Sequence, residues 1–496
     1  MKYFKNFFFS TFVILIIYII YSYFNYDVQY SYSKEKSILK NLKNKTDEQT
    51  KQKLKEYIFP YKYNSLYKKK LKELDNKIIN LQKKIESKNK IIDKLIKKNG
   101  VYFYETEKKN ININKKKKTF TKFTTDHLLI GKYEVAKSTS YLETFEDKFI
   151  LSTATGTFLY TDIENLEKND FFLKPIASNL SEIIKYNEFY IRSYYGIKDI
   201  LIKNDKIYIS YSNQSEANCY NTAILYADIN FKKLNFKKFF SPKICVKEKN
   251  LYGEYDGTQG GGRLVDYSLN EILFSTGEYK FRDHAQNKKN VLGKIISINL
   301  KNQKSKIVSM GHRNPQGLYY DKNNNYIIST EHGPVGGDEI NLNIQNEANL
   351  DSKKIIKNYG WPISSYGEHY NKNKRDYSEE IDGPLYKKAP FHKSHKKYGF
   401  IEPLKVFTPA IGISQIIKIP SLSHEEFFVG GMGFDPNEGD LSIHHLKYNK
   451  KFSKLIEHNI ILLNERIRDM IFVENINKVF LFLESSASIG IIDLNS

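Results

Sequence analysis

Three short segments in the second half of the chain hold the residues best suited to chemistry. They read GHRNPQGLYYD (311–321), EHGPVGGDEINL (331–342) and NYGWP (358–362), and the last contains the only tryptophan of the chain. In the second segment a Gly-Pro pair and a Gly-Gly pair predict a tight loop with exposed carbonyl oxygens, and Asp338 and Glu339 add carboxylates. Hard oxygen donors of this kind suit calcium. The alternative is an ordinary acidic turn.

Arginine is rare in this chain, so each one is informative. Nearly all of the 78 basic residues are lysines. Only arginine offers a planar, permanently charged fork that fits carboxylate or quinone oxygens. The seven arginines are Arg192, Arg263, Arg282, Arg313, Arg375, Arg466 and Arg468.

The two cysteines, Cys219 and Cys245, have two interpretations. They are either two buried thiols that pack as small apolar residues, or a disulfide that indicates an oxidising compartment. The chain has no CxxC motif and no cysteine–histidine cluster with zinc spacing.

Together and in this order, the three segments closely resemble the PQQ-dependent soluble glucose, aldose and sorbosone dehydrogenases. The likeness covers most of residues 126–496 and includes GGRL (261–264), STGE (275–278) and ERIRD (465–469). Members of that family are six-bladed β-propellers that bind pyrroloquinoline quinone (PQQ) and calcium, usually outside the cytoplasm. The resemblance implies an oxidoreductase that oxidises aldose sugars or related alcohols. Because no haem-attachment CxxCH motif is present, electrons would pass to a separate acceptor.

The resemblance also implies which residues contact the cofactor. In the family, the arginine and asparagine of the HRNP motif and both arginines of the late R-x-R-D motif touch the quinone. The matching residues are Arg313, Asn314, Arg466 and Arg468. Arg263 falls in the GGR motif, where we expect a structural role.

Calcium positions follow from the same resemblance. Carbonyl oxygens of the family's GP loop hold the calcium beside the quinone, which matches Gly333 and Pro334. A second, structural calcium is bound near the DE-I-N and NYGWP motifs, which matches Glu339 and Tyr359.

At the catalytic base this sequence departs from the family pattern. The family carries a histidine four residues before the GGR arginine, and here that residue is Gln259. Glutamine has no basic nitrogen near neutral pH, so it cannot take the proton from a sugar hydroxyl. Asp256, Glu254 and His332 are the candidate replacements in the neighbouring motifs.

Two further positions differ from the family. Tyr194 stands where members carry a glutamine before a GLL segment, and Gly433 stands where some members place a lysine that pairs with a cofactor carboxylate. Two functions therefore remain open: a membrane-anchored quinoprotein oxidoreductase, and a catalytically inactive propeller that binds a glycan or a protein partner at the cell surface.

The elements that must position these residues are short strands. From residue 126 onward, short β-rich runs recur at regular spacing, bounded by Asn, Asp or Gly turns, and no long helical period competes with them. A chain of this length with many short strands favours a propeller over a sandwich. Six four-stranded blades of roughly 62 residues fit residues 126–496.

An apolar run at residues 7–24 predicts an N-terminal membrane anchor (1–25). Eighteen residues rise about 27 Å as a helix, which is enough to span the hydrocarbon core. A cleaved signal peptide is the alternative, but the run ends in tyrosines, phenylalanine and asparagine rather than small residues. We expect a single-pass protein of the inner membrane with the propeller outside the cytoplasm, in the periplasm, chiefly because the family is found there.

Between anchor and propeller we expect a polar linker (26–65), a coiled coil (66–99) and a basic linker (100–125). Heptad spacing of three and four relates the apolar residues Leu71, Leu74, Ile78, Leu81, Ile85, Ile92 and Leu95. This pattern predicts a homo-oligomeric stalk. The alternative is a single amphipathic helix folded onto the next domain.

The formal charge of +22 does not by itself indicate nucleic-acid binding. Lysine is abundant along the whole chain, and no basic stripe stands apart from a neutral background. A diffuse basic surface gives only salt-sensitive, non-specific affinity, so we expect no specific nucleic-acid partner.

Overall fold

The computed structural model describes residues 65–125, 138–250, 255–334, 336–345, 356–367 and 395–495. The chain divides into two units, Met1–Ser87 and Lys88–Ser496. Helix α5 (Ser65–Asn99) runs from the first unit into the second. No helix in the described residues is long and apolar enough to cross a membrane. The predicted anchor at 7–24 and nearly all of the linker at 26–65 lie outside these residues.

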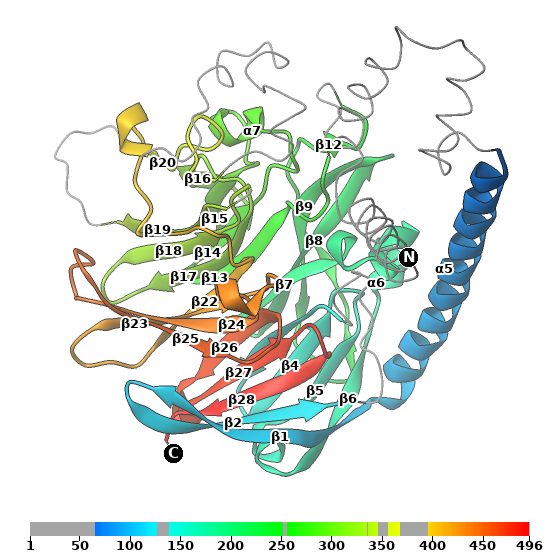
Figure 1. Ribbon diagram of the computed structural model, residues 1–496, viewed down its shortest axis with the longest axis horizontal. Coiled ribbons are helices and arrows are strands. Elements are labelled where there is room, and N and C mark those ends of the chain that lie inside the picture. The colour runs from blue at the N-terminus through cyan, green and yellow to red at the C-terminus, as the bar shows by residue number, and fades with distance from the viewer. Residues whose placement is uncertain are drawn as a thin grey trace, which may run out of the picture. The chain divides into compact units, whose positions relative to one another are not determined.

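The described strands of the second unit form five hydrogen-bonded sheets of ten, five, five, four and four strands, and these contain six four-stranded antiparallel groups, which we call sheets one to six (Figure 1). Strand β1 (Val101–Ile113) joins sheets six and one into the ten-stranded sheet. Sheets one to three are β3–β6 (Ser140–Phe145, Lys148–Thr153, Phe158–Asp162, Asp170–Ser178), β7, β8, β9 and β11 (Ile197–Lys203, Lys206–Glu216, Cys219–Asp228, Lys237–Phe240), and β13–β16 (Gly261–Ser268, Glu271–Thr276, Lys294–Asn299, Ser305–Met310). Sheets four to six are β17, β18, β19 and β21 (Pro315–Asp321, Tyr326–Glu331, Asp338–Ile344, Lys405–Phe407), β22–β25 (Ile413–Ile419, Glu425–Gly431, Ser442–Tyr448, Leu455–Leu462), and β26, β27, β28 and β2 (Ile467–Val473, Lys478–Leu483, Ser488–Asp493, Lys116–Thr124).

The first strands of the six sheets make a closed ring. In order around the ring, β3, β7, β13, β17, β22 and β26 each contact the next, and β26 contacts β3 again. The predicted all-β class is confirmed, and the ring is consistent with a β-propeller whose sheets are the blades. Smaller elements complete the described part: β10 (Lys233–Leu234), β12 (Val246–Lys247), β20 (Lys357–Asn358), α6 (Leu180–Ile183), α7 (Asp283–Gln286) and the 3₁₀ helices η1 (Ile163–Glu167), η2 (Asn187–Tyr190), η3 (Ser193–Tyr195), η5 (His395–Tyr398), η6 (Pro436–Glu438) and η7 (Glu474–Ile476).

The hydrophobic core lies between neighbouring sheets. Between sheets one and two, for example, Ile150 and Phe158 pack with Ile209 and Leu225, and all four are at most 2 % exposed. Similar clusters fill the other interfaces, including the one between sheets six and one. Because each blade is buried on both faces, its strands read as nearly continuous apolar runs. This packing fixes the inner strands, whose first residues form the site described below.

A β-hairpin replaces the predicted basic linker at 100–125, and the propeller therefore begins well before residue 126. Strand β1 (Val101–Ile113) pairs with β6 of sheet one, and β2 pairs with β28 as the outer strand of sheet six (Figure 1). Asn114 and Lys115 form the turn with φ of 52° and 62°, as a two-residue hairpin turn requires. The linker prediction was wrong because the lysines of 115–118 obscured an alternation of apolar and polar residues in both strands.

Helix α5 agrees in position with the predicted stalk. In the single chain, most seam residues whose side chains are described are between 46 % and 57 % exposed: Leu71, Leu74, Ile78, Leu81 and Leu95. Near the end of the helix, Ile92 and Ile96 pack instead on the core between sheets six and one. The last turns of α5 therefore belong to the propeller, as the amphipathic-helix alternative expected, while the preceding seam remains available for pairing.

The cysteine question is settled by a disulfide between Cys219 and Cys245. Cys219 begins β9, and the residue after Cys245 begins β12, which pairs antiparallel with β9. The bond therefore closes a loop of 26 residues across one sheet.

Removal of this disulfide is expected to cost about 3 kcal/mol of unfolding free energy, because the open loop gains conformational freedom in the unfolded chain. We would compare urea unfolding of the wild type with a Cys219→Ala, Cys245→Ser variant. Wild type kept in a reducing agent is the matched control and is expected to unfold at the same midpoint as the variant. Equal midpoints for oxidised, reduced and substituted protein would contradict this expectation.

Candidate functional site

A cavity of about 340 Å³ lies at the end of the ring where the innermost strands begin. Each inner strand contributes a residue at its start or just before it: Tyr141, Lys198, Gly261, Gln316, Gly412 and Arg468. The volume is in the range of small-ligand sites. The cavity gathers the residues predicted for cofactor contact and catalysis, namely Gln259, Arg313, Asn314, Arg466 and Arg468, together with Asp256, His332 and Gly333.

Two of its arginines share one buried carboxylate. Arg466 Nε donates to Glu484 Oε2 at 3.0 Å, and Arg468 Nε donates to Glu484 Oε1 at 2.8 Å. Thr139 Oγ1 also donates to Glu484 Oε1. Arg466 further donates to the carbonyl of Met432. One carboxylate thus orients two guanidinium forks and leaves the pair with a net positive charge, which suits an anionic ligand.

The HRNP segment is held from behind by buried Glu331. Its carboxylate accepts from the backbone N–H of Arg313 at 2.7 Å and lies 2.7 Å from His312 Nδ1. The Arg313 guanidinium donates to the carbonyl of His332 and lies 5.5 Å from the ring centre of Trp361. These contacts fix the guanidinium against an aromatic face at the edge of the cavity.

Asn314 links two inner strands rather than pointing freely into the cavity. Its Oδ1 accepts from the backbone N–H of Gly261 at 3.1 Å and from Gln316 Nε2 at 3.0 Å. Its carbonyl oxygen is therefore used within the protein, and only the amide nitrogen remains for a ligand.

Gln259 lies on the loop that precedes β13, 4 % exposed. Its Nε2 donates to Asp256 Oδ2 at 3.3 Å, while its Oε1 has no hydrogen-bond partner although it is buried. A buried acceptor without a donor carries a desolvation cost. The amide is therefore suited to accept a hydrogen bond from a ligand hydroxyl.

Lys198 is a site residue that sequence reasoning missed. It is the second residue of β7, it lines the cavity, and its Nζ donates to the carbonyls of Tyr194 at 3.0 Å and Gly257 at 3.3 Å. Burial and the charge of Arg468 lower the pKa of Lys198 to about 7, although Asp256 opposes this. A lysine inside the apolar run of an inner strand was the signal in the sequence.

Of the three candidate replacement bases, the structure describes His332 and Asp256. Burial, followed by the charges of Arg313, Arg468 and Arg466, lowers the pKa of His332 to about 3. Neutral His332 is therefore a weak proton acceptor near pH 7. Asp256 lines the cavity and accepts from Thr258 through Oδ1 and from Gln259 through Oδ2. Glu254 lies outside the described residues.

The two other departures from the family pattern also line the cavity. Tyr194 lies beside the Lys198 amine through its backbone carbonyl. Gly433 has no room for any side chain, because a Cβ there would lie 1.9 Å from Asp440 Oδ2. That carboxylate instead accepts from the backbone N–H groups of Phe434 and Asp435.

The four residues predicted for calcium line one small cavity of about 10 Å³: Gly333, Pro334, Glu339 and Tyr359. The carboxylates of Asp338 and Glu339 already have partners within the protein. Asp338 accepts from the backbone N–H groups of Gly333 and Ile413, and Glu339 lies 2.9 Å from His395 Nε2. Burial raises the pKa of Asp338 to about 7. Backbone carbonyls of the GP loop are thus the donors that remain for a cation.

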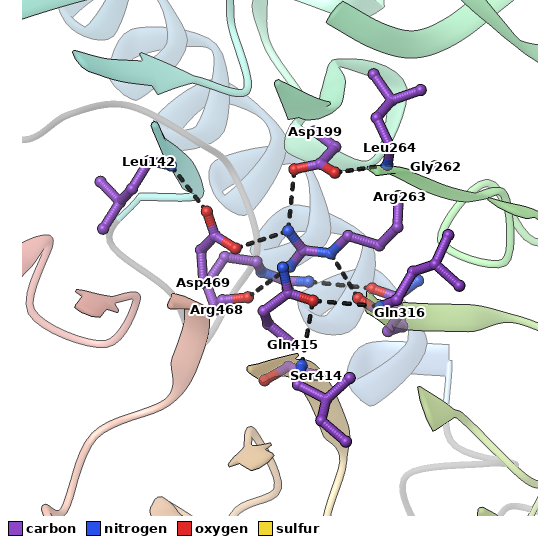
Figure 2. Close-up of polar contacts among 12 residues, drawn as sticks. Leu142, Asp199, Gly262, Arg263, Leu264, Gln316, Ser414, Gln415, Arg468 and Asp469 are labelled. Atoms are coloured by element: carbon purple, nitrogen blue, oxygen red, sulfur yellow. Dashed lines mark hydrogen bonds and ion pairs between the residues drawn. The ribbon is translucent and has the colours of Figure 1, made fainter. Parts of the chain in front are cut away.

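Arg263 joins inner strands of the ring through a buried network of polar contacts (Figure 2). Its NH1 donates to Asp199 at 3.0 Å and to Asp469 at 2.6 Å, while Nε and NH2 donate to the carbonyls of Gln316 and Arg468. The two carboxylates in turn accept from the backbone N–H groups of Leu264 and Leu142. One buried guanidinium therefore ties four blades together, which bears out the structural role expected for Arg263.

Comparisons of the sequence and fold with known proteins show which family this chain resembles. The family model described as glucose / sorbosone dehydrogenase matches residues 176–489. An uncharacterized protein of Synechocystis is 32 % identical over 206 residues, which cover 38 % of this chain and 42 % of that protein. The aldose sugar dehydrogenase YliI of Escherichia coli is 28 % identical over 199 residues, which cover 36 % of this chain and 48 % of the relative. The matched stretch thus spans less than half the length of these two curated relatives.

Among solved structures, the soluble aldose sugar dehydrogenase of Escherichia coli in its apo form aligns with a TM-score of 0.53 and 19 % identity, covering 72 % of this chain and 96 % of that chain. At this identity the likeness shows the fold.

Proposed function

Since this chain belongs to the glucose/sorbosone dehydrogenase family, we propose that it is a quinoprotein oxidoreductase that oxidises aldose sugars or related alcohols with PQQ and calcium. The observation that carries this proposal is the convergence of Arg313, Arg466 and Arg468 on one cavity. Three of the seven arginines of the chain meet there, although they come from two distant parts of the sequence.

The residues of the cavity fit such a cofactor. PQQ carries three carboxylates and two quinone oxygens, and the cavity offers three guanidinium groups against the carboxylates of Asp256 and Glu484. The net positive charge and the forked donors match a planar polyanion. The unpartnered Oε1 of Gln259 lies in the same cavity and suits a sugar hydroxyl.

When bound, the quinone supplies the hydride acceptor for oxidation of the substrate. The chain itself performs the remaining tasks. Arg466 and Arg468 hold anionic groups, with Glu484 fixing both forks. Gln259 Oε1 orients the hydroxyl that is oxidised. Phe434 is 63 % exposed beside the cavity, 5.1 Å from the Arg466 guanidinium, and offers an apolar face to a sugar ring.

Calcium is part of the proposal through the backbone. Gly333 lines both the large cavity and the small one, so its carbonyl and that of Pro334 are close to the cofactor position. Carbonyl oxygens are suitable calcium ligands. Glu339 would first have to exchange its contact with His395, so a structural calcium at Glu339 and Tyr359 is less well supported than one at the GP loop.

A catalytically inactive propeller is the second candidate function, and Gln259 favours it. Without the histidine of the family, the same cavity would bind a glycan or a protein partner at the cell surface. The shared arginine pair argues for cofactor binding, because an inactive site has no need of two forks aligned by one carboxylate.

We also propose that residues 7–24 anchor the protein in the inner membrane, that the propeller lies in the periplasm, and that the chain oligomerises through α5. The disulfide supports an oxidising compartment. The exposed seam of α5 supports pairing with further copies of the chain.

An optical titration of the full-length chain in detergent, with PQQ and calcium, tests the function. Binding is expected to change the fluorescence of Trp361, which lies beside Arg313 and is the only tryptophan. Addition of an aldose is then expected to bleach the absorbance of the oxidised quinone. Binding without bleaching by any sugar would favour the inactive candidate, and an absence of binding would contradict the quinoprotein proposal.

A further inference from the structure

Neither of the replacement bases that the structure describes is suited to the task. His332 has a pKa of about 3 and is surrounded by three arginines, so it competes poorly for a proton. The carboxylate of Asp256 already accepts from Thr258 and Gln259 and lies 3.7 Å from Lys280 Nζ. A dehydrogenase with this cavity needs a different proton acceptor.

The side chain of Lys198 crosses the glycine-rich loop that carries Gln259. A Cβ on Gly260 would lie 2.9 Å from Lys198 Cε, and one on Gly262 would lie 2.4 Å from Lys198 Cβ. Gly260 and Gly262 therefore make room for this lysine. Its amine reaches the carbonyl of Gly257 on the same loop, which brings it next to the position of the family's histidine.

The hydrogen bonds of the amine leave one position open. A neutral amine has two N–H donors and one lone pair, whereas an ammonium has three donors. The carbonyls of Tyr194 and Gly257 take two donors, so the neutral form keeps its lone pair available. Lys294 is a useful contrast: it is also buried, but it donates to three carbonyls, those of His284, Ala285 and Leu292, and it lies outside the cavity lining.

We propose that Lys198 is the general base of this enzyme, in the role that the histidine has in the family, with Gln259 Oε1 orienting the hydroxyl of the substrate. This inference rests on the proposed function. The hydroxyl proton passes to Nζ of neutral Lys198, the hydrogen on the same carbon leaves with its electron pair to the quinone, and the carbonyl C=O double bond forms. The ammonium then returns its proton to water.

The charged surroundings support a neutral amine at working pH. Burial and Arg468 lower the pKa of Lys198 to about 7. The charged and titratable groups that share its cavity are Tyr141, Tyr194, Asp256, Arg313, His332, Arg466, Arg468 and Glu484. The base is active when deprotonated, so the rate is expected to rise about tenfold per pH unit below the pKa and to level off above about pH 7.

The first test does not depend on activity. Trace acetylation of the cofactor-free, full-length chain with acetic anhydride, followed by mass spectrometry of the Lys198 peptide, gives the pH at which the amine becomes reactive. We expect a midpoint near pH 7, whereas ordinary exposed lysines have midpoints near about 10. A midpoint near 10 for Lys198 would overturn the assignment.

The second test separates a base from a cofactor contact. Lys198→Met is expected to bind PQQ within about threefold of the wild type, yet to reduce it with sugar about 100- to 10,000-fold more slowly. Introducing Gln259→His into that variant restores the base of the family and is expected to recover at least about tenfold of the loss.

The contrary outcomes are distinct. Equal reduction rates for wild type and Lys198→Met would overturn the base assignment alone. A parallel loss of PQQ affinity and rate would make Lys198 a cofactor contact and would also overturn it. If the wild-type chain binds PQQ but no sugar reduces the bound PQQ, the proposed function and this inference are both overturned.

Discussion

Replacing Arg263 with methionine is expected to lower the unfolding free energy by about 3–5 kcal/mol, because two buried carboxylates lose their common counter-ion. Asp199 and Asp469 are at most 5 % exposed and both bond the same guanidinium nitrogen. Methionine fills similar space without the charge. Urea unfolding followed by circular dichroism measures the difference.

The cost of this substitution is expected to depend on pH. Burial already raises the pKa of Asp199 to about 7 against the opposing charge of Arg263. Without the arginine that pKa rises further above its unfolded value. A raised acid pKa gives stability that is present at low pH and lost as pH rises through the folded pKa. The variant is therefore expected to be closer to the wild type at pH 5 than at pH 8.

Lys206→Met is the matched control, because it removes an ion pair with Asp228 at the surface, where the side chain of Asp228 is 74 % exposed. Its expected cost is less than about 1 kcal/mol. Adding Asp469→Asn to Arg263→Met removes one uncompensated charge and is expected to recover part of the loss. A cost for Arg263→Met no larger than that of the control would show that the ring does not depend on this network.

Arg468→Ala is expected to weaken PQQ binding about 10- to 100-fold, since a hydrogen bond to a charged group contributes about 1.5–3 kcal/mol and each 1.4 kcal/mol is tenfold in affinity. The described contacts of Arg468 use Nε and NH1, which leaves further N–H groups of its fork for the cofactor. Titration followed by Trp361 fluorescence measures the dissociation constant without requiring turnover.

Two further variants help to interpret the PQQ affinity of Arg468→Ala. Arg468→Lys keeps the charge but loses the fork, so an intermediate affinity is expected. Arg192→Ala removes an arginine that is exposed and does not line the cavity, and it is expected to leave PQQ affinity unchanged within about twofold. If Arg468→Ala binds PQQ as tightly as Arg192→Ala, the R-x-R-D arginines do not hold the cofactor.

The sequence predicted the site residues best where they belong to one short, contiguous motif. The R-x-R-D spacing places Arg466 just before β26 and Arg468 as its second residue, where both donate to Glu484. The HRNP and GP segments could be assigned because each is a contiguous motif of the family that the sequence resembles. The residues predicted from these motifs line the cavity or its neighbour: Arg313, Asn314, Gly333, Pro334, Arg466 and Arg468.

The sequence could not predict contacts between residues of different blades, because these contacts form only when the ring closes. Lys198 and Gln259 belong to different blades, and no periodicity relates a strand of one blade to the loop that enters the next. The contacts of Asp338 and Glu339 likewise became visible only in three dimensions, since Ile413 and His395 are far away in sequence. The β1–β2 hairpin was not predicted for a local reason. Its lysines suggested a basic linker, although they are the polar residues of an alternating apolar and polar pattern.

That hairpin has a consequence for how the protein is made. Thr119 of β2 pairs with Asp493 of β28, so an early strand waits for a partner that is synthesised much later. At about 5–20 residues per second, this delay is on the order of 20 to 70 seconds. Until β28 is available, one edge of β2 has no partner strand. The lysines of β2 disfavour pairing of that edge with other nascent chains. Sheet six can be completed only after β28 has emerged, so a chain that lacks β28 would leave this edge of β2 unpaired.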